Sequence, residues 1–147
     1  WDTAILCIIF FPLFFLFYDL YQIYLFHTHF VPALPKDIHL WALYQVFLVA
    51  LPEEFFYRGY LQTMLSTAFG RPYRLLGTRW GHGLLISNFF FALGHVLFDM
   101  NPLRFNVFFP GLAFGWMRER TGLLGPVLFH ALCNIFVKIL EASFIST

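Results

Sequence analysis

The sequence predicts an all-α protein, a polytopic bundle of about five transmembrane helices. Hydrophobic residues fill 60% of its 147 positions, charged residues only 12%, and the mean hydropathy is +0.71. Long apolar runs alternate with short segments that carry most of the charge, whereas helices of a soluble domain would show polar faces. Strands in lipid would have to close into a barrel, so the runs are interpreted as helices. We therefore expect an integral membrane protein with lipid as one of its partners.

The first helix is expected over residues 4–26. It carries Asp19 close to Tyr18, Tyr21 and Tyr24, and tyrosines of this kind gather where a helix leaves the hydrocarbon. Asp19 is therefore interpreted as a solvated residue at a helix end, with a buried polar site as the alternative.

A second helix is expected over residues 39–65, after Pro32 and Pro35 interrupt the pattern. Pro52 lies inside this helix, and because proline removes a backbone hydrogen bond, the helix should be kinked there. A polar connection with three arginines follows over residues 66–80.

Three more helices are expected over residues 81–98, 105–117 and 126–144. The fourth helix is short for a membrane span. Pro126 suits the first turn of the fifth helix, because its missing N–H would have no helical partner there.

The cations in the loops predict the orientation in the membrane. Five arginines follow the second and fourth helices, against two cations in the loops on the other side. The first group is Arg71, Arg74, Arg79, Arg118 and Arg120, and the second is Lys36 and Arg104. Because cytoplasmic loops are enriched in Lys and Arg, we expect the turns after the second and fourth helices in the cytoplasm.

Charge and cysteine usage exclude other classes of protein. The formal net charge is +1 without a basic stripe, so no nucleic-acid partner is expected. Cys7 and Cys133 lie in apolar runs and lack the spacing of metal ligands, so they are expected to be packing residues. The chain begins with Trp1 and has no basic region before its first apolar run, which indicates a fragment rather than a signal peptide.

Two adjacent carboxylates, Glu53 and Glu54, lie in an apolar stretch where charge is costly and usually functional. Glu54 and Arg58 are four residues apart with the acid first, so they share a helix face and can pair. Glu53 is turned by about 100° from that pair. Glu53 is therefore the carboxylate left free to act, and Glu54 with Arg58 is expected to orient the helix.

Two further helices carry polar residues in this pattern. His130 and Asn134 share a face of the fifth helix, and Phe91 and His95 share a face of the third. A single intramembrane histidine more often bonds to a helix carbonyl. Buried polar groups without hydrogen-bond partners cost free energy, and polar groups on three helices can become each other's partners if they converge. This favours one shared site.

Other small or polar residues have simpler interpretations. Asn88 lies on roughly the same face as the histidine of the third helix. It is expected either to support the site or to form a plain interhelical hydrogen bond. Gly111 and Gly115 are expected to serve packing within the bundle rather than dimerisation, and no oligomeric state is predicted. Lys138 is expected to snorkel or pair with Glu141, outside the site.

The expected helix ends place the two histidines at different depths. His130 would lie near the cytoplasmic end of the fifth helix and His95 near the opposite end of the third. Either the third helix starts later and extends further than its apolar run suggests, or the helices tilt and kink, as Pro52, Pro110 and Gly94 would permit.

Three motifs in this order resemble the CPBP intramembrane proteases, also called the Abi or CAAX-protease family. They are Glu53-Glu54-x-x-x-Arg58, Phe91-x-x-x-His95 and His130-x-x-x-Asn134. Residues 111–122 and 126–131 also look like that family's third and fourth core helices. The resemblance covers about residues 51–136. It implies a four-helix catalytic core at about 39–144 in a single domain, 1–147, with an accessory helix and loop over 1–38.

What the resemblance implies is hydrolysis of a peptide bond inside or at the edge of the bilayer. Glu53 together with His95 would activate a water, and His130 with Asn134 would stabilise the oxyanion, the role usually worth most in acyl transfer. No cofactor is expected, although Glu53, His95 and His130 would also suit a zinc ion.

The resemblance also implies a membrane-anchored protein or peptide as substrate, of the CAAX type or with a C-terminal sorting signal. The compact chain favours a bacterial inner membrane. Two rival functions use the same residues. An ion or proton relay would employ Glu53, His95 and His130. A bis-His haem protein would use the two histidines as axial ligands, which leaves the glutamate pair and Asn134 unexplained.

Overall fold

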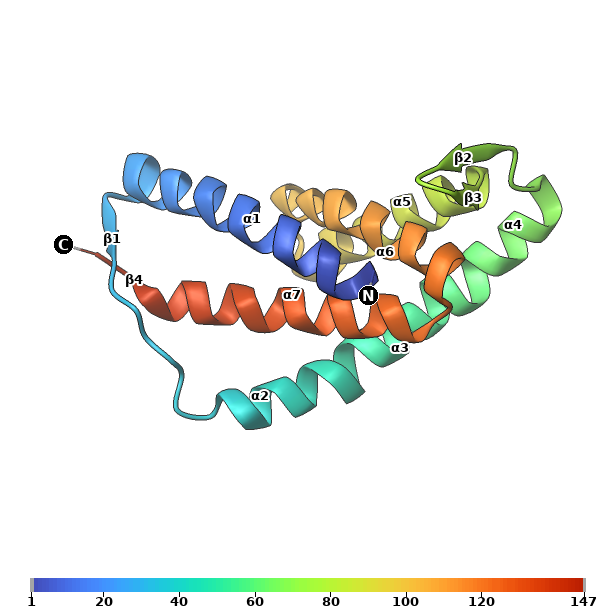
Figure 1. Cartoon of the computed structure of the whole chain (residues 1–147). Coiled ribbons are helices and arrows are strands. Elements are labelled where there is room, and N and C mark those ends of the chain that lie inside the picture. The colour runs from blue at the N-terminus through green and yellow to red at the C-terminus, as the bar shows by residue number, and fades with distance from the viewer. Residues whose placement is uncertain (1, 147) are drawn as a thin grey trace.

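Helices make up most of the computed structural model, which describes residues 2–146 (Figure 1). Trp1, the observation behind the fragment prediction, and Thr147 lie outside the described residues. The helix α1 spans Asp2–Phe26, close to the expected range. It packs on α7, Leu124–Ser143, through aromatic rings such as Phe11 and Phe136, whose centroids are 4.8 Å apart. Many apolar side chains of α1 remain exposed, as suits contact with lipid.

The second helix is longer than expected and is not a uniform α-helix. It consists of α2, Ile38–Tyr44; η1, Gln45–Ala50; α3, Leu51–Glu54; η2, Phe55–Gln62; and α4, Thr63–Phe69. We call residues 38–69 the rod. Both η segments are π-helical and lie on either side of Pro52, whose missing N–H interrupts the α-helical hydrogen bonds. Figure 1 shows the rod changing direction between α2 and α4, in agreement with the kink expected at Pro52.

The remaining helices follow the expected order with shifted ends. They are α5, His82–Asp99; η3, a 3-10 helix over Pro102–Val107; α6, Phe108–Thr121; and α7. Met100, with a left-handed φ of 50°, ends α5, and the side chain of Asn101 accepts a hydrogen bond from the N–H of Leu103 at 3.0 Å to cap η3. The fourth helix therefore begins and ends later than predicted.

Two short antiparallel strand pairs were not predicted. Strand β2, Tyr73–Leu75, pairs with β3, Thr78–Trp80, inside the connection that the sequence indicated only as polar. Strand β1, Thr28–Phe30, pairs with β4, Phe144–Ser146, and so ties the end of α1 to the end of α7. Strands of three residues are too short to show a recognisable alternation in the sequence.

Three helices among the described residues are long and apolar enough to cross a membrane: Ala4–Phe26, His82–Asp99 and Leu124–Ser143. The five spans expected from the sequence are thus not all shown. The rod is divided by its π-helical segments, and the 14 residues of α6 extend about 21 Å at about 1.5 Å per residue, less than the hydrocarbon thickness of about 30 Å.

An apolar core lies between α5, α6 and α7. Its buried members are Phe91, Phe114, Met117, Phe129 and Cys133. The thiol of Cys7 packs against this cluster, and both cysteines are free. Their predicted role as packing residues is confirmed.

The close approach of α5 and α6 depends on two glycines. A Cβ added at Gly111 would collide with Oδ1 of Asn88, and one at Gly115 would lie 2.8 Å from Cγ of Leu84. Both contacts are within the bundle, so the small-residue pattern serves internal packing, as predicted.

Candidate active site

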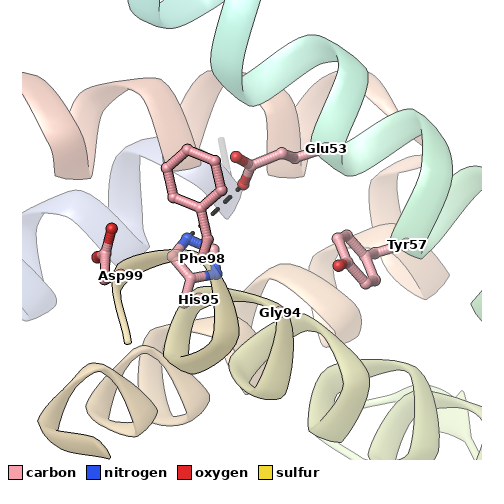
Figure 2. A pocket seen from close by; sticks show the side chains of 6 residues that line it. All are labelled: Glu53, Tyr57, Gly94, His95, Phe98 and Asp99. Atoms are coloured by element: carbon pink, nitrogen blue, oxygen red, sulfur yellow. Dashed lines mark ion pairs between the residues drawn. The ribbon is translucent and has the colours of Figure 1, made fainter. Parts of the chain in front are cut away.

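Glu53, His95 and His130 come together although they belong to α3, α5 and α7. Oε2 of Glu53 lies 3.9 Å from Nε2 of His95 and 3.9 Å from Nε2 of His130. Figure 2 shows Glu53 pointing from the rod toward His95. Among the described residues, Oε2 of Glu53 is buried without a hydrogen-bond partner. One unpaired carboxylate oxygen therefore faces two imidazoles.

A pocket of about 250 Å³ lies beside these side chains. Its lining residues are Glu53, Tyr57, Gly94, His95, Phe98 and Asp99 (Figure 2). The side chains of Glu53 and His95 are 30% and 27% exposed, whereas that of His130 is 5% exposed. A molecule in the pocket would thus meet Glu53 and His95 first, with His130 behind them.

Each histidine holds its other ring nitrogen in a fixed hydrogen bond. Nδ1 of His95 lies 3.0 Å from the carbonyl oxygen of Phe91, and Nδ1 of His130 lies 2.9 Å from Oε1 of Glu54. Because a carbonyl and an ionised carboxylate only accept, this network assigns the hydrogen to Nδ1 in both rings. The Nε2 atoms that face Glu53 are then acceptors in neutral rings and donors in protonated ones.

Glu54 and Arg58 form a buried ion pair behind His130. Nη1 of Arg58 lies 3.1 Å from Oε1 of Glu54, and both side chains are 0% exposed. The same oxygen accepts the hydrogen bond from His130, so the pair does more than orient the rod. Nη2 of Arg58 donates to Oδ1 of Asn88 at 3.2 Å and to the carbonyl of Gly111 at 3.1 Å. Asn88 is therefore linked to His130 through Arg58 and Glu54.

Aromatic rings complete the surroundings of these charges. The guanidinium of Arg58 lies over the ring of Phe91, 4.1 Å from its centroid. The ring of His130 stacks on Phe114 with centroids 4.8 Å apart. A cation over an aromatic face is stabilised where water is excluded, so the apolar core itself helps to hold Arg58.

Asn134 lies one turn beyond His130 on α7 and is held by a different partner. Its Nδ2 donates to Oε1 of Gln45 at 2.7 Å, and within residues 2–146 Asn134 makes no hydrogen bond to Glu53. An amide has two N–H groups, so one remains available. Gln45 is buried and was missed in the sequence. The signal was available, because an amide inside an apolar helix needs a partner.

A second buried polar cluster, also missed, joins the rod to α6. Nε2 of Gln62 donates to Oε1 of Glu119 and to the carbonyl of Gly115, both at 2.9 Å. Arg71 pairs with Glu119 at 2.6 Å. Gln62 follows Arg58 by four residues, so the same helix-face rule could have found it. This cluster lies away from the pocket and fixes the neighbouring loop.

The polar residues that the sequence placed outside the site remain outside it. Nζ of Lys138 lies 3.9 Å from Oε2 of Glu141, the predicted pairing, and above the ring of Trp41. Asp19 is half-buried on α1, near the expected end of the first span.

The expected difference in depth between His95 and His130 is wrong. Nε2 of each histidine lies 3.9 Å from the same oxygen of Glu53, so the two rings reach one level in the bundle. Helix α7 begins at Leu124, two residues earlier than expected. His130 is thereby raised toward the level of His95.

The residues do not fit a metal ion as they are placed. Four ligands at about 2.1 Å around zinc would lie about 3.4 Å from one another, whereas Glu53 is 3.9 Å from each histidine nitrogen. Within residues 2–146, no group of three His, Cys, Asp or Glu side chains is arranged to hold a metal.

A comparison with protein-family models matches residues 35–136 to the family described as type II CAAX prenyl endopeptidase Rce1-like. The matched range contains every residue of the site described above. Comparisons with curated proteins and with solved structures gave no match.

Proposed function

This chain belongs to the type II CAAX prenyl endopeptidase Rce1-like family, and from that membership we propose that it hydrolyses a peptide bond at a centre formed by Glu53, His95 and His130. The chain is a protease of this family, and the family implies cleavage within a membrane. The role of each single residue is inferred from its geometry.

One observation carries the proposal: the unpaired Oε2 of Glu53 faces Nε2 of both His95 and His130 at 3.9 Å. Atoms at that distance do not hydrogen-bond to each other. A single water about 2.8 Å from Oε2 of Glu53 and from Nε2 of His95 nevertheless fits between these two atoms. It would donate to Glu53 and to His95, with its lone pair left to attack a substrate carbonyl in the pocket.

The proposed reaction keeps its protons on these side chains. Glu53 accepts a proton from the water as the oxygen attacks, and the same carboxylic acid then protonates the leaving nitrogen when the tetrahedral intermediate collapses. His95 holds the water in line, because Nδ1–H is fixed on Phe91 and Nε2 is free to accept.

His130 and Asn134 are proposed to bind the oxyanion. His130 donates from Nε2 when it is protonated, and Glu54 stabilises that protonated ring through Nδ1. The positive and negative groups then alternate from Arg58 through Glu54 and His130 to Glu53, so no charge is buried without a neighbour of opposite sign. Asn134 contributes the N–H that Gln45 leaves unused.

The membrane arrangement is proposed to include five crossings with a four-helix catalytic core. The rod and α6 would be the two crossings beyond the three long apolar helices. The substrate is a membrane-associated protein or peptide, of the CAAX type or with a C-terminal sorting signal. Phe98, 91% exposed at the edge of the pocket, offers an apolar surface to such a chain. The proposed location is a bacterial inner membrane.

The haem alternative is less compatible with this geometry than hydrolysis, and the ion relay is distinguished from hydrolysis by assay. A haem between His95 and His130 would need the space in which Glu53 lies, 3.9 Å from both. An ion relay would produce flux across liposomes without cleavage of any peptide.

The test is a cleavage assay with the purified full chain in liposomes. Prenylated CAAX peptides and peptides with a C-terminal sorting signal serve as substrates for the wild type, Glu53→Gln and Glu53→Ala. We expect cleavage by the wild type to fall roughly 10²- to 10⁴-fold or more in either variant, since the base is lost. Little change in thermal stability is expected, because Oε2 of Glu53 has no partner within the described chain. Cleavage that survives Glu53→Ala would refute the assignment.

A further inference from the structure

The hairpin formed by β2 and β3 places two arginines side by side. Arg74 and Arg79 are directly opposite each other in the antiparallel register. The hairpin turn has two residues, so the pair that closes it is Leu75 and Thr78. The next pair, Arg74 and Arg79, is then a non-hydrogen-bonded pair, the type of antiparallel pair in which opposite side chains lie closest together. Like charges in that position repel each other and destabilise the hairpin.

The local structure does not compensate this repulsion. Both arginines are exposed. Arg79 uses its Nε on the carbonyl of Arg71 at 3.3 Å, and no partner of Arg74 was found within residues 2–146. The nearby acid, Glu119, is already bound by Arg71 and Gln62. The pair of guanidinium groups therefore lacks an anion.

The hairpin presents this pair away from the protein. Side chains alternate along a strand, so the arginines lie on the face opposite to Tyr73 and Trp80. That other face is turned toward α6, where Nε1 of Trp116 donates to the carbonyl of Leu75 at 3.2 Å and Thr78 is buried. The two arginines consequently form an outer surface that packing leaves open.

Two features place the surface among lipid headgroups. Strand β3 ends at Trp80, two residues before α5 begins its span at His82. Tyr73 and Trp80, whose ring centroids are 4.9 Å apart, are residue types that are enriched at the membrane interface. At the tip, Leu76 is 77% exposed with a left-handed φ of 50°. An exposed leucine at a position that favours Gly or Asn suits an apolar surrounding rather than water.

We propose that Arg74 and Arg79 form a binding site for the phosphate of an anionic phospholipid headgroup, with Leu76 inserted beside its acyl chains. A guanidinium pair binds a phosphate with parallel, charge-assisted hydrogen bonds, and the anion removes the repulsion across the strands. The site lies apart from the pocket and does not depend on the proposed cleavage.

The test measures binding of fluorescent phosphatidylglycerol and phosphatidylcholine to the full chain in detergent. We expect the wild type to prefer phosphatidylglycerol, and Arg74→Gln with Arg79→Gln to lower that affinity by roughly 30-fold, about fivefold for each charge. Leu76→Asn should lower the affinity for both lipids equally, because it removes only the apolar contact. Arg104→Gln is the matched control, since Arg104 is exposed at the other end of α5 and pairs with Asp99.

Two results would overturn the proposal. The first is a preference for phosphatidylglycerol that is unchanged in the double variant, or a loss of that preference in Arg104→Gln as large as in the double variant. The second concerns the source of the anion: inorganic phosphate that binds with the same arginine dependence and is not displaced by phosphatidylglycerol would identify a site for a free anion. Arg74→Lys with Arg79→Lys, which retains the charges, should keep a reduced preference and so distinguishes loss of charge from damage to the hairpin.

Discussion

Adjacent glutamates have different surroundings in this protein. Glu54 is completely buried and its Oε1 receives hydrogen bonds from Arg58 and His130, whereas Glu53 is partly exposed and its Oε2 is unpaired. The separation follows from the helix, since consecutive side chains point about 100° apart. One carboxylate can thus be a fixed counter-charge while its neighbour is free to exchange a proton.

The ion pair of Glu54 and Arg58 is predicted to contribute separately to stability and to activity. Glu54→Met or Arg58→Met alone should destabilise the fold by about 3–5 kcal/mol, since each leaves a buried charge without its partner. The double variant should be more stable than either single one, because both charges are removed. Thermal or denaturant unfolding in detergent measures these effects.

Activity distinguishes two roles for this pair. If Glu54 acts on His130, the double variant regains stability but stays inactive, because Nδ1 of His130 has lost its acceptor. If the pair only orients the rod, activity should return together with stability. Recovery of cleavage in the double variant would therefore contradict the role of Glu54 at His130.

Chelation is predicted to leave cleavage unchanged. Glu53 and the two histidine nitrogens are spaced more widely than the ligands of a zinc ion, and the proposed proton transfers need no metal. Initial rates should agree within twofold before and after treatment with EDTA or 1,10-phenanthroline. A loss of activity that added zinc restores would show that the three side chains close around a metal.

At the residue scale, the sequence predicts contacts within a helix better than contacts between helices. The four-residue spacing correctly predicted the pairing of Glu54 with Arg58. The hydrogen bond from His130 to Glu54 and that from Asn134 to Gln45 were missed. Spacing along one helix fixes which residues share a face, but the register between helices depends on their lengths and tilts.

At the element scale, the rod owes its shape to a proline next to the site. Pro52 directly precedes Glu53 in α3, and one π-helical segment ends just before α3 while the other begins just after it. A π-helical turn widens the helix and shifts the direction of the side chains that follow. The interruption therefore helps to set the direction in which Glu53 and Glu54 point.

Gly111 is predicted to be essential for the contact between α5 and α6. Gly111→Ala would place a methyl group on Oδ1 of Asn88 and 3.1 Å from Nη2 of Arg58. The helices would have to separate, so we expect a destabilisation of about 1–3 kcal/mol together with reduced activity. Gly59→Ala is the matched control: its nearest neighbour would be 3.6 Å away, and alanine stabilises a helix interior relative to glycine by roughly 0.5–1 kcal/mol. Equal unfolding temperatures for Gly111→Ala and Gly59→Ala would contradict the proposed collision at position 111.

The elements that the sequence predicted well are those with long apolar runs. Helices α1, α5 and α7 begin and end within about two residues of expectation. The hairpin was missed although Gly77, with a φ of 82°, is a typical turn residue. Its strands have three residues each and depend on α6 for support, through the bond of Trp116 to Leu75. Such tertiary support leaves no local pattern.

At the scale of the whole molecule, the two ends of the bundle differ in charge. The hairpin and the turn after α6 lie together, as the bonds from Arg71 to Glu119 and from Arg120 to Leu76 show. The arginines that predicted the orientation therefore gather at one end. The residues of the pocket, from Gly94 to Asp99, lie near the other end of α5. Orientation thus decides from which side the pocket is reached.

The topology is predicted to place Pro72, which directly precedes β2, in the cytoplasm and Leu103 on the opposite side. Both are exposed, and α5 lies between them. Pro72→Cys and Leu103→Cys, each in a background with alanine at positions 7 and 133, should be labelled from opposite sides by a thiol reagent that does not cross membranes. Labelling of both from one side would contradict a membrane-spanning α5.

The side from which Pro72→Cys is labelled also distinguishes the two proposed classes of substrate. If Pro72 faces the cytoplasm, the pocket lies toward the outer surface, which favours C-terminal sorting signals. If Pro72 faces the outside, the pocket lies toward the cytoplasm, where prenylated CAAX proteins are anchored. The excess of arginines around Pro72 supports the first outcome.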